Sequence, residues 1–537
     1  MSATSEHARA AEAPRRPQSR DPATGEVIGS VEVIEPASIE RVVLDVARVQ
    51  PLWALLRVRD RARYMRGMAQ AVIDDFDALL ASLSREQGRP RAEIASLELL
   101  AAIDALLWIA QDGERVLGSR KIAVSRTTSL ATRARVAYEP YGVIGVIGAG
   151  SAPFAQPLGQ IAGALLAGNG VVFKPALRAA LAGERIAAVL ARAGLPEGLV
   201  RVVHGSAEAG VALAQAPLDK VLFTGSPAVG RAVARACVSH EKEVTLELGG
   251  KDAMLVLADA NVPRAVAGAL WSGCAGAGQA RGSVERAYVA QEVYESFVGQ
   301  LVDGARALRV GDPSLPTTQV GPLASTRRLT HVQELVADAV AQGARLRCGG
   351  PAQPPACELG SFYAPAVVTE ATHAMRLLRE PIDGPVVAVV RVESIGEAIA
   401  LANDGDHGLG ASVWTSDRYR AMRIARELHA GMVWLNDHLP GPMLARGPWG
   451  AAAGSGLGRT LGEAGLRACA QEKLIAWTPP QLRGPWWGPY DEVLASAART
   501  VAGLRSARPG DRRQARRRGA TALARAGARA LGQGLPR

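Results

Sequence analysis

The sequence predicts an α/β fold with two doubly wound, Rossmann-like lobes, and three observations lead to this class. Short, fully apolar runs such as Val143–Ile147 are typical of buried parallel strands. Helical stretches separate these runs at the spacing of βαβ units. A second alternating region follows the first, and two α/β lobes with a cleft between them are a common enzyme layout.

The first half of the chain begins with a polar segment, residues 1–20, which we expect to be disordered. Apolar residues then recur at helical spacing from Ile39 to Leu117, which predicts several amphipathic helices. The first lobe follows. Its expected strands are 143–147, 171–173, 200–203, 221–223 and 244–246, and its expected helices are 180–193, 207–216 and 229–238.

The second lobe is predicted from the same alternation of strands and helices. Its expected strands are 253–257, 287–290, 386–392, 411–414 and 433–435, and its expected helices are 261–274, 292–308 and 418–429. A segment rich in Thr and Arg, 125–133, lies between the early helices and the first lobe and suggests a surface hairpin. Another helix is expected over 492–504.

The net charge of +11 is concentrated at the end of the chain. Residues 505–537 contain ten arginines and one aspartate, a net charge of +9, which leaves +2 for the rest of the 537 residues. We expect this tail to be solvated and disordered. Contact with an acidic partner, anionic lipid or nucleic acid is the alternative, although the tail has no aromatic residue to stack on bases.

Composition excludes several other classes of protein. Apolar residues make up 48% and charged residues 21%, as in ordinary globular chains. The five cysteines are scattered and form no CxxC pair, which argues against a disulfide framework or a zinc site, and the eight histidines form no metal-ligand pattern. We therefore expect no metal. Without an apolar leader or an uninterrupted apolar stretch, the chain is expected to be cytoplasmic and to have no membrane span.

A series of short motifs resembles the aldehyde dehydrogenase superfamily in order and spacing. They are Gly168-Asn169-Gly170 with Lys174-Pro175, Phe223-Thr224-Gly225-Ser226 with Gly230, Glu247-Leu248-Gly249-Gly250-Lys251, Gly311-Asp312-Pro313, Trp434-Leu435-Asn436 and Ser455-Gly456-Leu457-Gly458-Arg459. The resemblance runs from about residue 20 to 477 and implies an aldehyde-dehydrogenase-like fold. That fold has a nucleotide-binding lobe, a catalytic lobe and a small β oligomerisation arm.

The resemblance also implies domain boundaries. Residues 21–122 and 142–248 would form the nucleotide-binding domain, 249–446 the catalytic-type domain, and 123–141 with 447–480 the oligomerisation arm. Residues 481–537 would be a C-terminal extension that includes the Arg-rich tail. An arm of this kind implies a homo-oligomer, either a dimer or a tetramer, or assembly with an active relative.

The family's reaction is the oxidation of an aldehyde by NAD(P), with a cysteine nucleophile, an oxyanion-binding asparagine and a glutamate base. The glutamate is present as Glu247. The nucleophile position falls on Arg281, in Gly278-Gln279-Ala280-Arg281, and an arginine cannot attack a carbonyl. Arg281 either fills space or forms an ion pair with Glu247, since the two positions face one pocket in the family. The oxyanion position falls on Ser151.

The family's cofactor site is retained only in part. Lys174, Gly225, Ser226, Gly230 and Leu248 stand at positions that would contact NAD or NADP. The acid that often follows the lysine is replaced by Leu177, and the segment that grips the nicotinamide ribose reads Pro381-Ile382-Asp383-Gly384-Pro385, without its acid or its aromatic residue.

These substitutions predict a catalytically impaired or inactive member of the family that acts as a nucleotide-binding or partner subunit. Three alternatives remain open at this point. The first is an active dehydrogenase that uses Cys274, seven residues before Arg281, or a non-standard mechanism. The second is hydrolysis by water that Glu247 activates. The third is an interaction protein that acts through its basic tail.

Overall fold

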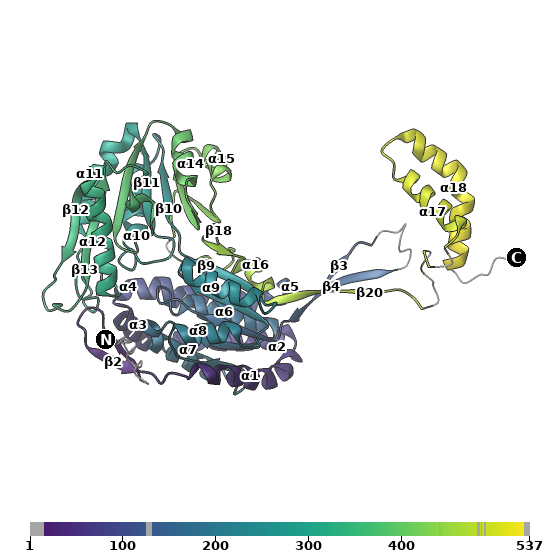
Figure 1. Ribbon diagram of the computed structural model, residues 1–537, viewed down its shortest axis with the longest axis horizontal. Coiled ribbons are helices and arrows are strands. Elements are labelled where there is room, and N and C mark those ends of the chain that lie inside the picture. The colour runs from purple at the N-terminus through teal and green to yellow at the C-terminus, as the bar shows by residue number, and fades with distance from the viewer. Residues whose placement is uncertain are drawn as a thin grey trace, which may run out of the picture. The chain divides into compact units, whose positions relative to one another are not determined.

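The computed structural model describes residues 16–124, 132–439, 441, 443–480, 484, 486–487 and 490–530. The chain divides into two compact units. We call Met1–Val116 with Pro140–Ala470 the core unit, and Leu117–Glu139 with Gln471–Arg537 the extension unit. Both predicted α/β lobes lie in the core unit, each built on its own sheet (Figure 1).

The N-terminal part of the core unit is mainly helical, as the apolar spacing predicted. Its elements are β1 (Gln18–Arg20), β2 (Val27–Ser30), η1 (Pro36–Ser38), α1 (Ile39–Ala54), α2 (Val58–Asp74), α3 (Phe76–Gln87), α4 (Arg91–Ile94), the π-helical η2 (Ala95–Leu100) and α5 (Ala101–Val116). The expectation of disorder over residues 1–20 is wrong at its end, because β1 pairs with β2 in an antiparallel ladder. Residues 1–15 lie outside the described part of the chain.

The first sheet has the order β19-β9-β8-β5-β6-β7. Its parallel strands are β5 (Val143–Ile147), β6 (Gly170–Lys174), β7 (Val200–Val202), β8 (Lys220–Gly225) and β9 (Glu243–Leu248), and β19 (Gly456–Leu457) pairs with β9 in the antiparallel sense. The helices are α6 (Ala155–Ala167), η3 (Leu177–Ala179), α7 (Ala180–Arg192), α8 (Ala207–Gln215) and α9 (Pro227–Val238). Every residue of β5 and β6 is buried, as both faces of a doubly wound sheet require.

The second sheet has the order β12-β13-β14-β11-β10-β16-β17, with only β12 antiparallel to its neighbour. Its strands are β10 (Asp252–Val256), β11 (Val284–Ala290), β12 (Arg345–Ala352), β13 (Phe362–Thr369), β14 (Val386–Val392), β16 (Gly410–Trp414) and β17 (Met432–Leu435). The helices are α10 (Val262–Cys274), α11 (Gln291–Ala307), α12 (Thr326–Ala341), α13 (Arg376–Arg379), α14 (Ile395–Asn403) and α15 (Arg418–Glu427). The pair β12 and β13 and the helices α12 to α14 were not predicted.

Two short connections bring the lobes together. The chain leaves β9 at Leu248 and enters β10 at Asp252, so the residues Gly249 to Lys251 join one sheet to the other. Later the chain returns to the first lobe through β18 (Ala452–Ala453), which pairs with β15 (His407–Gly408), and then through β19 and α16 (Gly462–Arg467). Glu247, near the end of β9, therefore lies next to the connection between the lobes.

The extension unit contains a three-stranded sheet and a helical hairpin. The sheet has the order β20-β4-β3, from β3 (Arg120–Ile122), β4 (Arg133–Pro140) and β20 (Ala470–Trp477). The expected hairpin over 125–133 falls mostly on residues outside the described ranges. Helices α17 (Glu492–Leu504) and α18 (Pro509–Ala530) lie side by side (Figure 1).

The expectation that the arginine-rich tail is disordered is wrong for residues 509–530, which form α18. Alanine and arginine both have high helix propensity. This segment therefore forms a helix although its sequence shows no clear apolar stripe. Small residues also let α18 approach α17 closely. A Cβ atom added at Gly519 would lie 2.0 Å from Cγ2 of Thr500, so only glycine allows this contact.

Candidate functional site

A cavity of about 560 Å³ opens in the core unit where strands of both lobes end. Gly148 to Ser151 follow β5, Lys174 ends β6, and Gly225 ends β8. Residues at the carboxyl ends of parallel strands form the usual ligand site of such a sheet. The second lobe adds the loop Gln279 to Ser283 and the segment Glu380 to Asp383.

Arg281 and Glu247 form an ion pair inside this cavity, as one of the two interpretations of Arg281 predicted. Nη2 of Arg281 binds Oε2 of Glu247, and Nη1 donates to the backbone oxygen of Glu247 at 3.3 Å. The side chains are 8% and 1% exposed respectively. Burial lowers the pKa of Arg281, and the neighbouring carboxylates of Glu247 and Asp252 oppose that shift. Arginine keeps its proton at any ordinary pH, so the Arg281 guanidinium remains charged.

Three further side chains donate to the carboxylate of Glu247. Gln156 donates from Nε2 to Oε2, Thr460 donates its hydroxyl to Oε1, and Nε2 of Gln160 lies 3.4 Å from Oε1. A carboxylate offers about four lone-pair sites. With Arg281, these donors occupy all four, so Glu247 has no site left for a water molecule.

Ser151 lines the cavity in the loop between β5 and α6. This is where the resemblance places the oxyanion donor. A serine hydroxyl can donate one hydrogen bond, but it lies on a shorter side chain than the amide of asparagine. Ser151 therefore keeps a hydrogen-bond donor at this position, but the donor extends less far into the cavity than an asparagine amide would.

Cys274 lies away from the cavity, at the end of α10, where it is 7% exposed. It packs in an apolar cluster with Ala277, Leu335 and Val386. Burial, and then the nearby carboxylate of Glu93, raise the pKa of the thiol to about 12. Because the thiolate is the nucleophilic form, burial outside the cavity lining opposes the alternative in which Cys274 attacks a substrate.

The predicted cofactor residues fall into two groups. Lys174, Gly225 and Ser226 line the cavity, and Pro227 begins α9 directly after Ser226. Gly230 and Leu248 instead pack against each other behind the cavity wall, where a Cβ atom at Gly230 would lie 2.3 Å from Cδ2 of Leu248. These two residues shape the turn rather than face a ligand.

The lining suits the adenosine and phosphate part of a dinucleotide. Nζ of Lys174 is buried and has a single hydrogen-bond acceptor within the described ranges, the backbone oxygen of Pro175 at 3.4 Å, and burial lowers the pKa of the amine to about 8. A buried amine with so little compensation favours an anionic or hydroxyl ligand. The first-turn N–H groups of α9 provide donors and a positive dipole end beside Gly225 and Ser226.

A second buried ion pair in the cavity was not predicted. Nζ of Lys251 lies 2.6 Å from Oε2 of Glu285, and both side chains are almost fully buried. Glu285 also accepts the backbone N–H groups of Ile382 at 3.0 Å and Asp383 at 3.4 Å. These backbone atoms belong to the segment Pro381 to Pro385, where the resemblance places the contact with the nicotinamide ribose. The only sequence signal was a charged residue, Glu285, next to an apolar strand.

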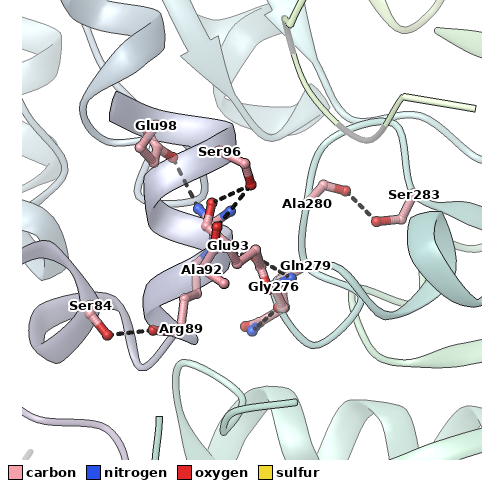
Figure 2. Close-up of polar contacts among 10 residues, drawn as sticks. All are labelled: Ser84, Arg89, Ala92, Glu93, Ser96, Glu98, Gly276, Gln279, Ala280 and Ser283. Atoms are coloured by element: carbon pink, nitrogen blue, oxygen red, sulfur yellow. Dashed lines mark hydrogen bonds and ion pairs between the residues drawn. The ribbon is translucent and has the colours of Figure 1, made fainter. Parts of the chain in front are cut away.

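A buried network links the helical segment 89–98 to the loop that carries Arg281, and Figure 2 shows this part. The same network reaches Ala155, directly after the loop that carries Ser151. Arg89 donates to Glu93 at 2.6 Å and to Glu98 at 3.0 Å. Glu93 also accepts the N–H of Gly276 at 2.7 Å, as Figure 2 shows. Glu98, in the π-helical η2, accepts the N–H of Ala155 at 2.8 Å. The network therefore anchors both loops to the same helical segment.

Neither a cluster of metal ligands nor a membrane-spanning helix is found in the described part of the chain. No group of three or more His, Cys, Asp or Glu side chains there is arranged to hold a metal ion. No helix among those residues is long and apolar enough to cross a membrane.

Comparisons with known proteins agree with this architecture. A sequence model described as the aldehyde dehydrogenase family matches residues 9–475. The chain is 36% identical over 445 residues to 4,4'-diapolycopene aldehyde oxidase from Methylomonas sp, covering 83% of this chain and 82% of that protein. It is 36% identical over 455 residues to a betaine aldehyde dehydrogenase from Cereibacter sphaeroides, covering 84% and 92%.

Solved structures give the same result and confirm the predicted α/β fold class. An aldehyde dehydrogenase from Mycobacterium tuberculosis in complex with NAD+ matches with a TM-score of 0.82 and 32% identity, over 86% of this chain and 95% of that one. A putative aldehyde dehydrogenase from Burkholderia cenocepacia matches with a TM-score of 0.82 and 31% identity, over 87% and 96%. The chain therefore belongs to the aldehyde dehydrogenase family, whose reaction is the NAD(P)-dependent oxidation of aldehydes.

Proposed function

We propose that this chain is a catalytically silent aldehyde dehydrogenase that binds NAD(P) and does not oxidise aldehydes through a thioester. The observation that carries the proposal is the buried ion pair between Arg281 and Glu247. The position assigned to the nucleophile holds a guanidinium, which has no lone pair to donate to a carbonyl carbon. The first step of the family's reaction, attack on the aldehyde carbonyl, therefore has no nucleophile.

The same ion pair removes the base of the second step. Glu247 is held by Arg281, Gln156, Gln160 and Thr460, which all donate to its carboxylate. A general base must direct a free lone pair at the water that it deprotonates. Glu247 acts here as the counter-ion of Arg281, and this geometry also opposes hydrolysis by water that Glu247 activates.

The retained cavity supports cofactor binding. Lys174 would meet a ribose hydroxyl or a phosphate, and the turn at Gly225 and Ser226 would present backbone N–H groups to the pyrophosphate. When bound, NAD(P) supplies a nicotinamide ring that accepts hydride. At the position where the resemblance places the ribose-binding acid, this chain has Pro381. The nearby acids are engaged: Asp383 pairs with Arg328, and Glu285 is bound to Lys251 and to the backbone of Ile382 and Asp383.

The oligomeric state belongs to the same proposal. The sheet of β3, β4 and β20 stands where the resemblance places the oligomerisation arm, and β20 is an edge strand with exposed residues at all but its first position. Exposed strand edges pair readily with another chain. We propose a homo-oligomer, either a dimer or a tetramer, and an active relative as the other partner that such an arm would accept.

The first test is calorimetric titration of the full-length protein with NAD+ and NADP+. Micromolar binding of at least one cofactor is expected, and Lys174→Met should weaken it about tenfold or more. Lys121→Met removes an exposed lysine elsewhere and is the matched control. Absence of binding of both cofactors would overturn the nucleotide-binding part of the proposal.

The second test measures NAD(P)H formation with a panel of aldehydes. The unmodified protein should show no turnover, whereas Arg281→Cys combined with Ser151→Asn should gain it, because a thiol returns and Glu247 is released. Arg281→Ala with Ser151→Asn releases Glu247 without supplying a thiol and should stay inactive. Turnover by the unmodified protein would overturn the proposal, and its loss in Cys274→Ala would assign the nucleophile.

A further inference from the structure

We propose that the hairpin of α17 and α18 is a docking surface for anionic phospholipid headgroups. The hairpin lies beyond residue 475, where the match to the family ends, so the family's reaction gives it no role. It also holds most of the net positive charge of the chain. The structure shows which of these charges are available to a partner.

Some arginines of the hairpin already have partners within it. Arg529 binds Asp491 at 2.5 Å, and Asp491 also caps α17 by accepting the N–H of Leu494 at 3.1 Å. Arg512 donates to the backbone oxygen of Ser506 at 2.8 Å. The Arg529–Asp491 pair links the end of α18 to the start of α17 and neutralises one charge, whereas Arg512 is tied to the backbone of the connection between the helices.

Five other arginines of α18 form a free basic surface. Arg513, Arg516, Arg517, Arg518 and Arg525 are exposed, and none of them has an ion-pair partner among the described residues. Arg513, Arg516 and Arg517 are spaced i, i+3 and i+4, which places them on one side of the helix. Guanidinium groups bind phosphate oxygens in a bidentate manner.

The residues between these arginines indicate that α18 would lie on the surface of a bilayer and would not insert into it. Ala520, Thr521 and Ala524 occupy exposed positions of α18 and carry no long apolar side chain. Such a helix lies at the level of the headgroups, where small side chains let the guanidinium groups approach the phosphates.

Aromatic residues next to the hairpin favour lipid over nucleic acid. Trp487 and Tyr490 precede α17 and are 66% and 89% exposed. Tryptophan and tyrosine prefer the boundary between water and lipid. Helix α18 itself carries no aromatic residue to stack on bases. Basic charge with flanking Trp and Tyr therefore fits an anionic bilayer surface.

The test is co-sedimentation of the full-length protein with vesicles of phosphatidylcholine alone or mixed with phosphatidylserine. Each basic residue near an anionic surface strengthens binding about fivefold, so Arg513→Gln/Arg516→Gln/Arg517→Gln should weaken it about 100-fold. Binding should also fall as salt shortens the screening length from about 10 Å at 0.1 M to about 3 Å at 1 M.

A matched variant distinguishes an effect of the α18 surface from an effect of the protein's net charge. Arg418, Arg423 and Arg426 are exposed on α15 and also lack an ion-pair partner among the described residues. Arg418→Gln/Arg423→Gln/Arg426→Gln removes the same charge and should leave vesicle binding unchanged. Equal loss in both variants, equal binding to neutral and anionic vesicles, or binding to a DNA duplex without binding to vesicles would each overturn the proposal. Circular dichroism confirms that both variants fold.

Discussion

At the scale of single residues, the pair of Arg281 and Glu247 decides both the chemistry of the cavity and part of its stability. A charge that is buried with its partner is tolerated, whereas the same charge alone is costly to keep out of water. The Glu247 side chain is 1% exposed, so its carboxylate would lose its cationic partner in a largely buried site if Arg281 were replaced. The two side chains therefore depend on each other.

This dependence predicts the effect of removing Arg281. Arg281→Met should lower the free energy of unfolding by about 3–5 kcal/mol, and adding Glu247→Gln should restore most of the loss. Arg328→Met is the control, since Arg328 and Asp383 are 29% and 47% exposed and their pair should contribute less than about 1 kcal/mol. Urea denaturation measures all four proteins, and a small cost for the single Arg281 variant would contradict the burial argument.

Lys174 gives a prediction about pH. Burial lowers the pKa of its amine from 10.5 to about 8, so the free protein loses this charge above pH 8. An anionic cofactor favours the charged form, and binding above pH 8 should therefore take up a proton. Calorimetry at pH 8.5 in buffers of different ionisation enthalpy detects the proton, and Lys174→Met should abolish it.

The same shift sets a trend in stability. Between pH 8 and 10.5 the unfolded chain carries a proton on Lys174 that the folded protein has lost. Stability rises with pH wherever the unfolded state binds more protons. This residue therefore makes the folded protein more stable across that window as the pH increases, while it weakens the anion site.

Part of this residue-scale picture could be predicted from the sequence. The motifs around Arg281 and Glu247 placed both residues at one pocket, so their contact was foreseeable. The donors Gln156 and Thr460 were not, because Thr460 is 213 positions from Glu247 and reaches it only through the strand β19. Glu285 was missed because nothing in its neighbourhood signals that two backbone N–H groups of a distant loop would face it.

At the scale of elements, the network of Arg89, Glu93 and Glu98 fixes two loops by separate contacts. Glu93→Ala removes the acceptor of the Gly276 N–H and should speed amide exchange in the loop 275–283 more than near Ala155. Glu98→Ala should give the reverse, since Glu98 holds the N–H of Ala155. Exchange measured by mass spectrometry checks both, and equal acceleration of both loops in each variant would indicate general destabilisation instead.

The two strands of the second sheet that the sequence did not predict, β12 and β13, share a physical reason. β13 contains Pro365, and β12 contains Gly349, Gly350 and Pro351, so neither resembles a strand in its residues. β12 is also mostly exposed and lies at the sheet edge, where such residues are tolerated. The buried strands of both lobes were predictable because burial on two faces demands an unbroken apolar run.

At the scale of the whole molecule, we expect two segments of the extension unit to have different roles. The sheet of β3, β4 and β20 would mediate assembly, and the hairpin of α17 and α18 holds most of the net charge. A chain that ends at Thr478 keeps β3, β4 and β20 and loses both hairpin helices. Its net charge falls from +11 to +2. We expect light scattering to show the same oligomer as the full-length protein and cation exchange to retain it much less. A truncated protein that runs as a monomer would instead place the assembly contacts in the hairpin.

The Arg281–Glu247 pair also has a consequence for evolution. Some arginine codons differ from cysteine codons by a single base, and serine codons at position 151 can reach asparagine by a similar step. The scaffold that would use these residues is still in place around the cavity. Two substitutions, Arg281→Cys and Ser151→Asn, would therefore return a thiol and an amide to this cavity without any change in the rest of its lining.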